Sequence, residues 1–467
     1  MINQLLSEFQ NINLGDPRRN RRSEVILERI QDCPSLSFPR IFPEKAELEA
    51  FYRFIESPYL EKDAIMAPHV NATHERIKGL DALLVVHDST KFVFPGVRDG
   101  LFTSKKEHNG SFWGHCSFAV DGGTGRPLGV LRMHTWVRES LTRTGAAKAG
   151  LSEKEIREIP SEHARWLEGI QAVSSLSKET SEAIHVCDSE ADCYDLLASL
   201  SEEKLRFVVR GCQDRRIEDE EPYANLRAKL SACPIIVKRT VQLSRRLKAT
   251  STTAKRNKAR EGREATLGIS SGQVTILRPK TASLGSPKQL KVNVVYVKEI
   301  DPPADCDAVE WLLLTSETIE VEEDLLRVID IYRNRWIIEE YFKAIKTGCA
   351  FENRQLESYD ALQRCLALFI PVAWLMLHMR TVSRQTPSEP AEQVLPAVFL
   401  DVLRAHTGKT IETAQEALFA TAKLGGHIKN NGAPGWLTLS RGFQELATMV
   451  CGYLLALHTV NLVKKKM

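Results

Sequence analysis

Short apolar runs alternate with helical segments through the middle of the chain, and this alternation restricts the possible folds most strongly. Leu83–Val86, Ala183–Cys187 and Phe207–Arg210 have the length and composition of buried strands, and Ala191–Leu200 between the last two has a helical pattern. Trp311–Thr315 is a further strand of this kind. Strands alternating with helices predict a mixed α/β sheet.

Two of these apolar runs are followed by an aspartate, Asp88 in the first and Asp188 in the second. The ends of strands in α/β sheets open onto solvent, so we expect both side chains to point into a cleft. Each aspartate alone could equally be an ordinary turn or helix-cap residue. The acidic neighbours Glu190 and Asp192 strengthen a metal-binding interpretation only slightly.

A long helix is predicted from about Val321 to Lys346, and it carries Tyr332, Arg335 and Glu339 as well as Lys346. At about 100° per residue these four side chains share one stripe about 60° wide. A carboxylate there can share a metal ion, while arginine, lysine and tyrosine hold phosphate oxygens. Salt bridging on a solvated helix face remains the alternative, because such spacings are common.

Three carboxylates from distant positions suit a site for two Mg²⁺ ions. Such a pair can activate a water or a 3′-hydroxyl and stabilise the leaving oxygen in an in-line displacement at a phosphate. Mg²⁺ prefers oxygen ligands and keeps several waters, so a few carboxylates suffice. Without the metals, the crowded like charges would be costly.

The net charge is only +3 although 26% of the 467 residues are charged, so any affinity for nucleic acid must come from local basic patches. One patch contains Arg18, Arg19, Arg21 and Arg22, on a helix that Pro17 opens. Such a cluster can bind phosphates or can be a solvated helix face.

A second basic patch extends from Lys238 to Arg263 and holds ten Lys or Arg residues and one acid, Glu261. The flanking segments Ile235–Leu243 and Val292–Val297 have strand character. We interpret the region as a β-rich insertion with a basic loop; a flexible exposed linker is the alternative.

Ten cysteines without a Cys-x-x-Cys pair indicate reduced thiols rather than disulfides or a zinc site. The first residues lack the pattern of a signal peptide. The longest apolar run, Cys365–Leu377, is shorter than the roughly 20 residues of a membrane span and predicts a buried helix. We therefore expect a cytoplasmic protein without a membrane partner, associated with the nucleoid when bound to DNA.

The spacing Tyr332-x2-Arg335-x3-Glu339-x6-Lys346 resembles the Tyr-Arg-Glu-Lys signature of bacterial insertion-sequence transposases with an Asp-Asp-Glu core. The likeness extends over nearly the whole chain. Further segments resemble the family's two aspartate segments, its N-terminal domain and its C-terminal domain: His87–Thr90, Val186–Asp192, Leu14–Arg19, Tyr52–Ile55, and Leu424–Gly426 followed by Trp436.

This resemblance implies an RNase H-like catalytic core, a mixed sheet with flanking helices, interrupted by a β-rich insertion and joined to helical N- and C-terminal domains. The corresponding boundaries are a DNA end-binding domain over 1–75, the core over 76–235 and 301–375, the insertion over 236–300, and a dimerisation domain over 376–467.

The resemblance also implies that Asp88, Asp188 and Glu339 are the catalytic residues and the ligands of two Mg²⁺ ions, with Mn²⁺ able to substitute. The implied reaction is cut-and-paste transposition: water nicks one strand, the freed 3′-hydroxyl forms a hairpin, and the reopened end joins target DNA. The implied partners are DNA and a second copy of the chain.

For DNA contacts the resemblance implies that Tyr332, Arg335 and Lys346 grip the backbone near the cleavage point, with Arg210 a weaker candidate. Trp311 would stack on a flipped base, whereas its sequence context alone indicates a strand core residue. Arg18 and Arg19 would contact the terminal sequences of the element.

At the C-terminal end, Leu446, Val450, Tyr453 and Leu457 have helical spacing. Most such stripes are core, but the resemblance implies a dimer interface here.

Two other functions remain open. A non-catalytic DNA-binding inhibitor of transposition would bind ends without cutting; truncated family members can act this way, but this chain keeps the N-terminal region and all three acids. An RNase H-like nuclease would cut DNA without joining it to a target.

Overall fold

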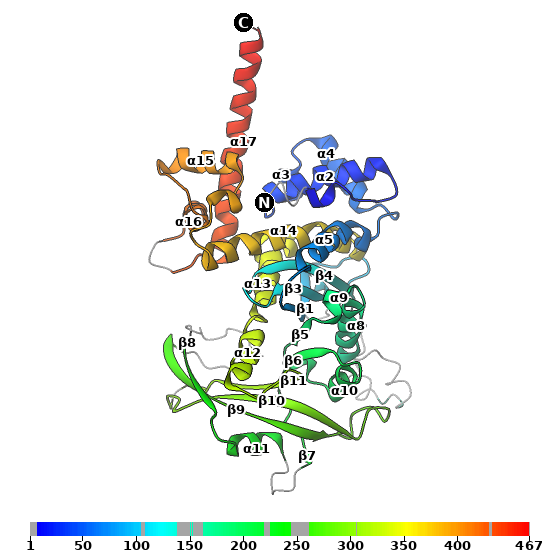
Figure 1. The fold of residues 1–467 in the computed structure, drawn as a ribbon. Helices are drawn as coiled ribbons and strands as arrows, with labels where there is room; N and C mark the ends of the chain where they lie inside the picture. Colours follow the sequence, from blue (N-terminus) through cyan, green and yellow to red (C-terminus); the bar gives the residue numbers. More distant parts are fainter. Residues whose placement is uncertain are drawn as a thin grey trace. The chain divides into compact units, whose positions relative to one another are not determined.

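The computed structural model describes residues 7–103, 108–137, 150, 152, 162–218, 225–243, 261–304, 306–428 and 432–466 (Figure 1). The chain divides into two compact units. The central unit comprises residues 82–88 and 157–335, and the terminal unit comprises residues 1–81, 89–156 and 336–467.

The central unit is built on a mixed sheet. The first part of β1 (Leu83–Pro95) pairs in parallel with β5 (Ile184–Cys187), which pairs in parallel with β6 (Arg206–Gly211). Antiparallel strands continue the sheet from β6 onward in the order β11 (Glu310–Thr315), β10 (Gln289–Glu299), β9 (Arg263–Leu277) and β7 (Ile217–Glu218), and β8 (Val237–Leu243) also pairs with β9. The prediction of a mixed α/β fold is therefore confirmed.

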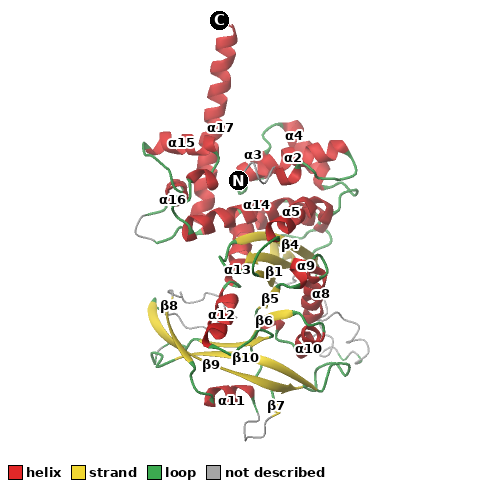
Figure 2. Cartoon of the chain, viewed as in Figure 1, coloured by secondary structure: helices red, strands yellow, loops and turns green. Residues whose placement is uncertain are grey.

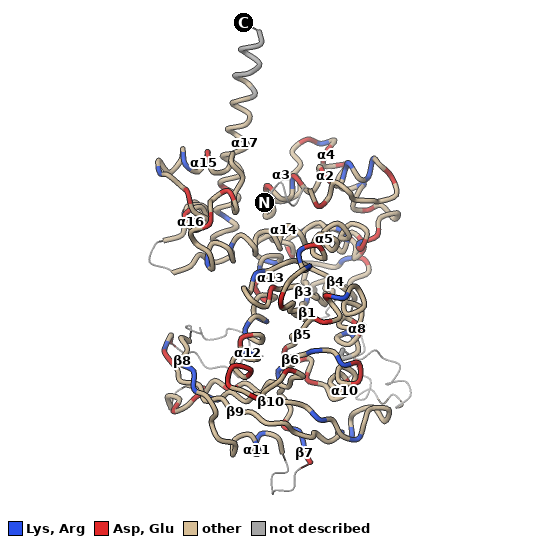
Figure 3. The backbone as a smooth tube through the Cα atoms, viewed as in Figure 1, with Lys and Arg blue, Asp and Glu red and all other residues tan. Residues whose placement is uncertain are grey.

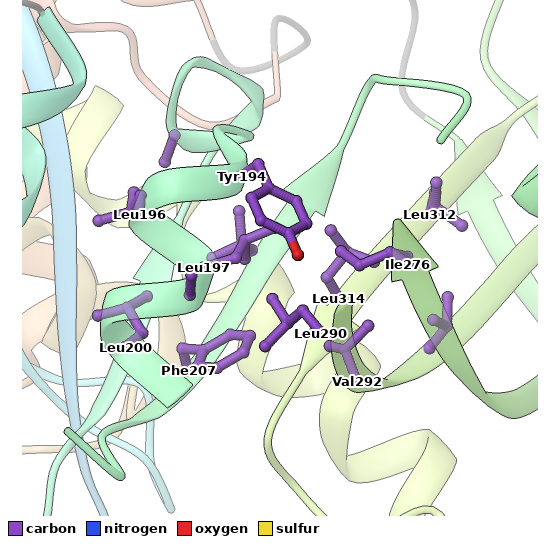
Figure 4. Close-up of a cluster of buried hydrophobic side chains, with 14 of the residues drawn as sticks. Tyr194, Leu196, Leu197, Leu200, Phe207, Ile276, Leu290, Val292, Leu312 and Leu314 are labelled. Carbon is purple, nitrogen blue, oxygen red and sulfur yellow. The ribbon is translucent and has the colours of Figure 1, made fainter. Parts of the chain in front are cut away.

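Helices of the central unit pack on this sheet through an apolar cluster (Figure 4). Tyr194 and Leu197 of α10 (Tyr194–Glu202) meet Phe207 of β6 and residues such as Leu290 and Leu314 of the antiparallel strands. Alternation along each strand sends these side chains to one face, and full burial of each stabilises the fold by about 1.5–3 kcal/mol. The remaining described helices of this unit are α8 (Glu162–Ser174), α9 (Lys178–Ser181), η1 (Ser189–Ala191), α11 (Leu226–Ala232) and α12 (Glu322–Arg333).

The terminal unit combines antiparallel strands with helices from both ends of the chain (Figure 2). Its strands are β2 (Phe102–Thr103), β3 (Asn109–Asp121), β4 (Pro127–Trp136) and the second part of β1. Its helices are α2 (Pro17–Asp32), α3 (Phe38–Ile41), α4 (Lys45–Ile55), α5 (Lys62–Ile77), α13 (Trp336–Lys343), η3 (Ala344–Gly348), η4 (Phe351–Asn353), α14 (Tyr359–Gln385), η5 (Ala391–Gln393), α15 (Ala397–Thr407), α16 (Ala414–Leu424) and α17 (Trp436–Lys466).

Helix α14 holds the terminal unit together. Within the described residues it is the one helix long and apolar enough to cross a bilayer, but 89% of its apolar window is buried by the rest of the protein, as in a core helix. Near its start, Arg364 donates to the backbone oxygens of Leu60 and Ile55 at 2.7 and 3.1 Å. These bonds fasten the N-terminal helices to α14.

Helices α16 and α17 approach each other through two glycines. A Cβ atom at Gly425 would lie 1.9 Å from the carbonyl oxygen of Thr438, and one at Gly442 would lie 2.0 Å from that of Thr421. Real atoms do not approach so closely, so both positions require glycine. This contact gives a physical reason for Gly425, which belongs to the Leu424–Gly426 segment that resembles the family's C-terminal domain.

The single helix predicted over residues 321–346 is wrong. Helix α12 ends at Arg333, and a new helix, α13, starts at Trp336. The side chain of Asn334 donates to the Asp330 carbonyl at 3.1 Å, and the Arg335 N–H bonds back to Tyr332 at 3.0 Å, so the last turn tightens and the helix stops. Beyond α13 the backbone widens into the π-helical turn η3.

The strands expected around the basic insertion are present as β8, β9 and β10. Most of the basic loop itself, residues 244–260, lies outside the described residues. All ten cysteines are free thiols, as expected from their spacing.

Candidate active site

Asp88 lies within a strand and not at its end, contrary to the sequence-based expectation. Strand β1 continues to Pro95 because Thr90, Phe92 and Phe94 alternate into the terminal unit's core. Pairing with β5 nevertheless stops at His87 and Cys187. Asp88 therefore stands where the parallel ladder ends, and its side chain is 13% exposed.

Asp188 is the first residue after β5. Its carboxylate accepts the backbone N–H of Glu190 at 2.8 Å and caps the short helix η1. Burial raises the pKa of the Asp188 carboxyl, and the Glu190 N–H, Arg335 and Arg210 offset part of that rise. The capping role considered from sequence is thus present, on a carboxylate that is also in the field of two arginines.

Arg335 links the two aspartates electrostatically. Its guanidinium lies 3.6 Å from the Asp88 carboxylate, and the side chain is 7% exposed. The arginine comes from the tight turn after α12, so the helix break places it here. Burial raises the pKa of the neighbouring Cys187 thiol well above its ordinary value, and both aspartates raise it further. This cysteine therefore stays a neutral thiol.

Tyr332, Arg210 and Trp311 lie beside this group in the central unit. Tyr332 is buried and meets the half-buried Trp311 edge-on, with ring centroids 5.3 Å apart and an interplanar angle of 70°. Burial raises the pKa of the Tyr332 hydroxyl, and Arg335 and Arg210 offset part of the rise. Arg210 is at the end of β6 and donates to the Glu310 carbonyl at 3.5 Å.

Glu339 and Lys346 belong to the terminal unit. Glu339 is half-buried on α13, and its neighbour Glu340 accepts the indole N–H of Trp436 at 2.9 Å. Lys346 in η3 donates to the Lys91 carbonyl at 2.6 Å. Burial lowers the pKa of Lys346, partly offset by Glu352.

Two aspartates, Arg335, Arg210, Tyr332 and Trp311 thus gather in one unit, while Glu339 and Lys346 lie in the other. Among the described residues, no group of three or more His, Cys, Asp and Glu side chains is close enough together to hold a metal ion. The predicted metal ligand set of Asp88, Asp188 and Glu339 remains a prediction.

The predicted basic helix near the N-terminus is present as α2. Asp16 caps it by accepting the Arg18 N–H at 2.8 Å, and Pro17 occupies its first turn. Arg18 is exposed, whereas the Arg19 guanidinium lies 5.1 Å from the ring centroid of Tyr59. The exposed face of α2 therefore offers cations to solvent.

The C-terminal stripe divides into two parts. Leu446 and Val450 are buried within the terminal unit, whereas Tyr453 and Leu457 are 43% and 42% exposed on the outer part of α17. Leu446 and Val450 are thus core residues. Of this stripe, Tyr453 and Leu457 are the residues exposed for the dimer interface that the resemblance implies.

Sequence reasoning missed a chain of buried histidines behind the aspartates. The Nε2 atom of His87 lies 2.9 Å from Nδ1 of His185, whose Nε2 atom lies 3.0 Å from the Ser174 hydroxyl. Burial lowers the pKa of His185 to about 4, so the ring is neutral. A histidine inside each apolar strand was the available signal, since a buried polar group needs a partner.

Asp192, the acidic neighbour that could have supported metal binding at Asp188, already has hydrogen-bond and ion-pair partners. Its carboxylate accepts the backbone N–H groups of Cys212 and Gln213, both at 2.7 Å, and pairs with the buried Arg215. These bonds fix the loop after β6 and leave Asp192 unsuited to bind a metal.

Comparison with known proteins gives two family matches. Residues 3–59 match the transposase DNA-binding family, and residues 163–370 match the transposase DDE domain family. The first match includes Arg18 and Arg19; the second includes Asp188 and Glu339 but not Asp88. Among solved structures, a piggyBac transposase synaptic complex with hairpin DNA is 12% identical, with a TM-score of 0.35, over 93% of this chain and 71% of that one.

Proposed function

We propose that this chain, whose matched domains are those of a DNA transposase, cuts and joins DNA at a site formed by Asp88, Asp188 and Glu339. One observation carries the proposal. Two aspartates from neighbouring parallel strands flank a single buried arginine, and the segment matched to the transposase DDE family supplies both Asp188 and Glu339.

The residues present fit divalent cations. All three proposed ligands are carboxylates, the donors that Mg²⁺ and Mn²⁺ prefer. Burial raises the pKa of the Asp188 carboxyl, so negative charge there lacks full compensation from the protein. Two bound Mg²⁺ ions would supply that compensation, activate the attacking oxygen and stabilise the leaving one.

The chain's own side chains would hold the DNA. Arg335 neutralises part of the carboxylate charge, and its positive charge would also attract phosphate oxygens. Further contacts to the DNA backbone would come from the cations Arg210 and Lys346 and from the hydroxyl of Tyr332. Trp311 is half-buried and edge-on to Tyr332, which leaves part of its ring for a base turned out of the duplex.

Glu339 would complete the site from the terminal unit. The turn at Asn334 and Arg335 separates α13 from α12, so the position of Glu339 is not dictated by a continuous helix. We propose an RNase H-like core, a cut-and-paste reaction through a hairpin, and a homodimer that uses the exposed part of α17. Arg18 and Arg19 would bind the ends of the element.

A strand-nicking assay tests the proposal. The substrate is linear DNA carrying the sequences on either side of the gene, incubated with Mg²⁺, with Mn²⁺ or with a chelator. The wild-type chain should nick, form hairpins and join ends to a target plasmid. Glu339→Gln should bind the ends and fail to nick.

The alternatives give different results in the same assay. End binding without any metal-dependent cleavage by the wild-type chain would identify an inhibitor. Cleavage without joining would identify a nuclease. Undiminished cleavage by Glu339→Gln would remove this residue from the site.

A further inference from the structure

The central unit has a pocket of 560 Å³, a size typical of ligand sites. Four cations reach it from separate segments: Lys204 from the loop after α10, Arg206 from β6, Lys291 from β10 and Arg327 from α12. One carboxylate, Glu317, shares the lining, so positive charges exceed negative ones by three.

This pocket lies away from the aspartates. It gathers the start of β6 and the end of β11, whereas Arg210 and Trp311 mark the opposite ends of the same two strands. Arg206 and Arg210 are four residues apart, which is about 13 Å along a strand. A ligand here would not occupy the Asp88 and Asp188 site.

Glu317 organises the pocket. Its side chain is 3% exposed, and its two oxygens accept Nε and Nη2 of Arg206 at 2.9 and 2.5 Å. Arg327 donates to the same carboxylate at 2.9 Å, and the Asn293 amide donates to the Glu317 carbonyl at 2.8 Å. One buried acid therefore holds two guanidinium groups in fixed orientations. Arg206 also donates to the Glu182 carbonyl and Arg327 to the Thr318 hydroxyl, both at 3.4 Å.

The two lysines are not neutralised in this way. Lys204 and Lys291 are exposed, and neither forms an ion pair within the part of the chain that the structure describes. Asp324 is 3.8 Å from Arg327 and offsets some charge at one side. Basic and acidic positions both occur between α10 and β6 (Figure 3), where Glu203 directly precedes Lys204 in the sequence.

The lining favours a phosphate over a base. Its single aromatic residue, Phe207, is 1% exposed and offers no face for stacking. Apart from Leu205, Val292 and the Glu317 carboxylate, the other lining groups are amides, hydroxyls and cations, including Gln273, Asn293 and Ser316. Such groups bind phosphate oxygens without reading sequence.

We infer that this pocket binds a phosphodiester group of DNA, at a second DNA contact separate from the proposed catalytic carboxylates. The inference rests on the proposed function, because it takes DNA as the substrate. It adds a contact that would hold a duplex across the end of the central sheet opposite Asp188.

Fluorescence anisotropy with a labelled 40-base-pair duplex of mixed sequence tests this assignment across a series of salt concentrations. Each lost phosphate contact should make the slope of log affinity against log salt shallower by about 0.9. Because both lysines would contact the same phosphodiester group, Lys204→Ala/Lys291→Ala should make the slope shallower by about 0.9. Lys280→Ala/Lys298→Ala removes two exposed lysines of the same unit outside the pocket and should leave it nearly unchanged.

The outcomes separate the pocket from the proposed function. Equal slopes for the pocket variant and the wild type would contradict the assignment of the pocket to DNA phosphate. Equal changes of slope in the pocket and control variants would contradict it as well. Competition by dAMP or inorganic phosphate at millimolar concentration that depends on Lys204 and Lys291, with duplex binding unchanged, would assign it to free phosphates instead. If the wild-type chain neither binds the duplex nor nicks DNA, the proposed function itself is refuted.

Discussion

The two ends of strands β6 and β11 use the same chemical groups in different proportions. At one end, Asp88 and Asp188 share the field of Arg335, with Arg210 beside them. At the other, Arg206 and Arg327 share the buried carboxylate of Glu317. The first end sets two acids against two arginines and can accept added cations, whereas the second end has an excess of base that favours phosphate. The ratio of charges, and not their kind, separates the two ends.

The largest expected effect compares one carboxylate from each end. Asp188→Asn should reduce strand nicking on the order of a thousandfold or more, because a proposed metal ligand is lost. Glu317→Gln makes the same chemical change at the other end and should keep nicking within a few-fold at saturating DNA. Gel quantification of nicked DNA measures both rates. Equal losses would show that the two ends do not act separately.

Acid should weaken the aspartate end first, because it rests on the buried His185. The folded pKa of about 4 lies below the ordinary value of 6.5, so the unfolded chain takes up the proton first as pH falls. The neutral His185 ring therefore makes its full contribution to the free energy of unfolding above pH 6.5. This contribution, about 3 kcal/mol, is lost as the pH falls from 6.5 to 4. Hydrogen exchange should rise in β5 before β10, and His185→Gln should flatten this dependence. A dependence that survives the substitution would assign it to other groups.

Arg335→Lys tests whether geometry matters as well as charge. Lysine keeps the positive charge but cannot offer the planar fork of guanidinium donors to a carboxylate and a phosphate together. Nicking should fall roughly 10- to 100-fold with little change in duplex affinity. Arg333→Lys, on the exposed preceding turn, is the matched control. A full rate for Arg335→Lys would reduce Arg335 to a charge-balancing residue.

The smallest expected effect is on stability at the pocket end. Glu317→Gln leaves two half-exposed arginines without their shared anion and should cost about 1–2 kcal/mol in the free energy of unfolding. Water can solvate both guanidinium groups, which limits the loss. Urea denaturation measures it, with Glu320→Gln as a control at an exposed acid nearby. A loss no greater than that of the control would contradict the organising role of Glu317.

Local patterns allowed much of the fold to be predicted. Apolar runs located β5, β6 and β11, and the Asp16–Pro17 pair located the start of α2. These features depend on neighbours in the sequence. The break at Asn334 was missed because the bond from its side chain to the Asp330 carbonyl interrupts a good helical pattern, and no proline or glycine marks it.

Features that depend on distant segments could not be predicted. The His87–His185 bond needs the parallel register of β1 and β5, and the pocket needs four separate segments to meet at Glu317. Asp88 and Asp188 were identifiable because each follows a strong strand signal. Their shared arginine was on the predicted helix, but its contact with Asp88 depends on the turn that ends that helix.

The glycine contact between α16 and α17 leaves no spare room for even one methyl group. A Cβ at Gly442 would overlap the Thr421 carbonyl, so alanine there must push the last helix outward or tilt it. Gly442→Ala would therefore change how α17 packs on α16, at a position remote in sequence from every proposed catalytic residue. Because the Trp436 indole at the start of α17 donates to Glu340, such a shift would also reach α13, the helix that carries Glu339.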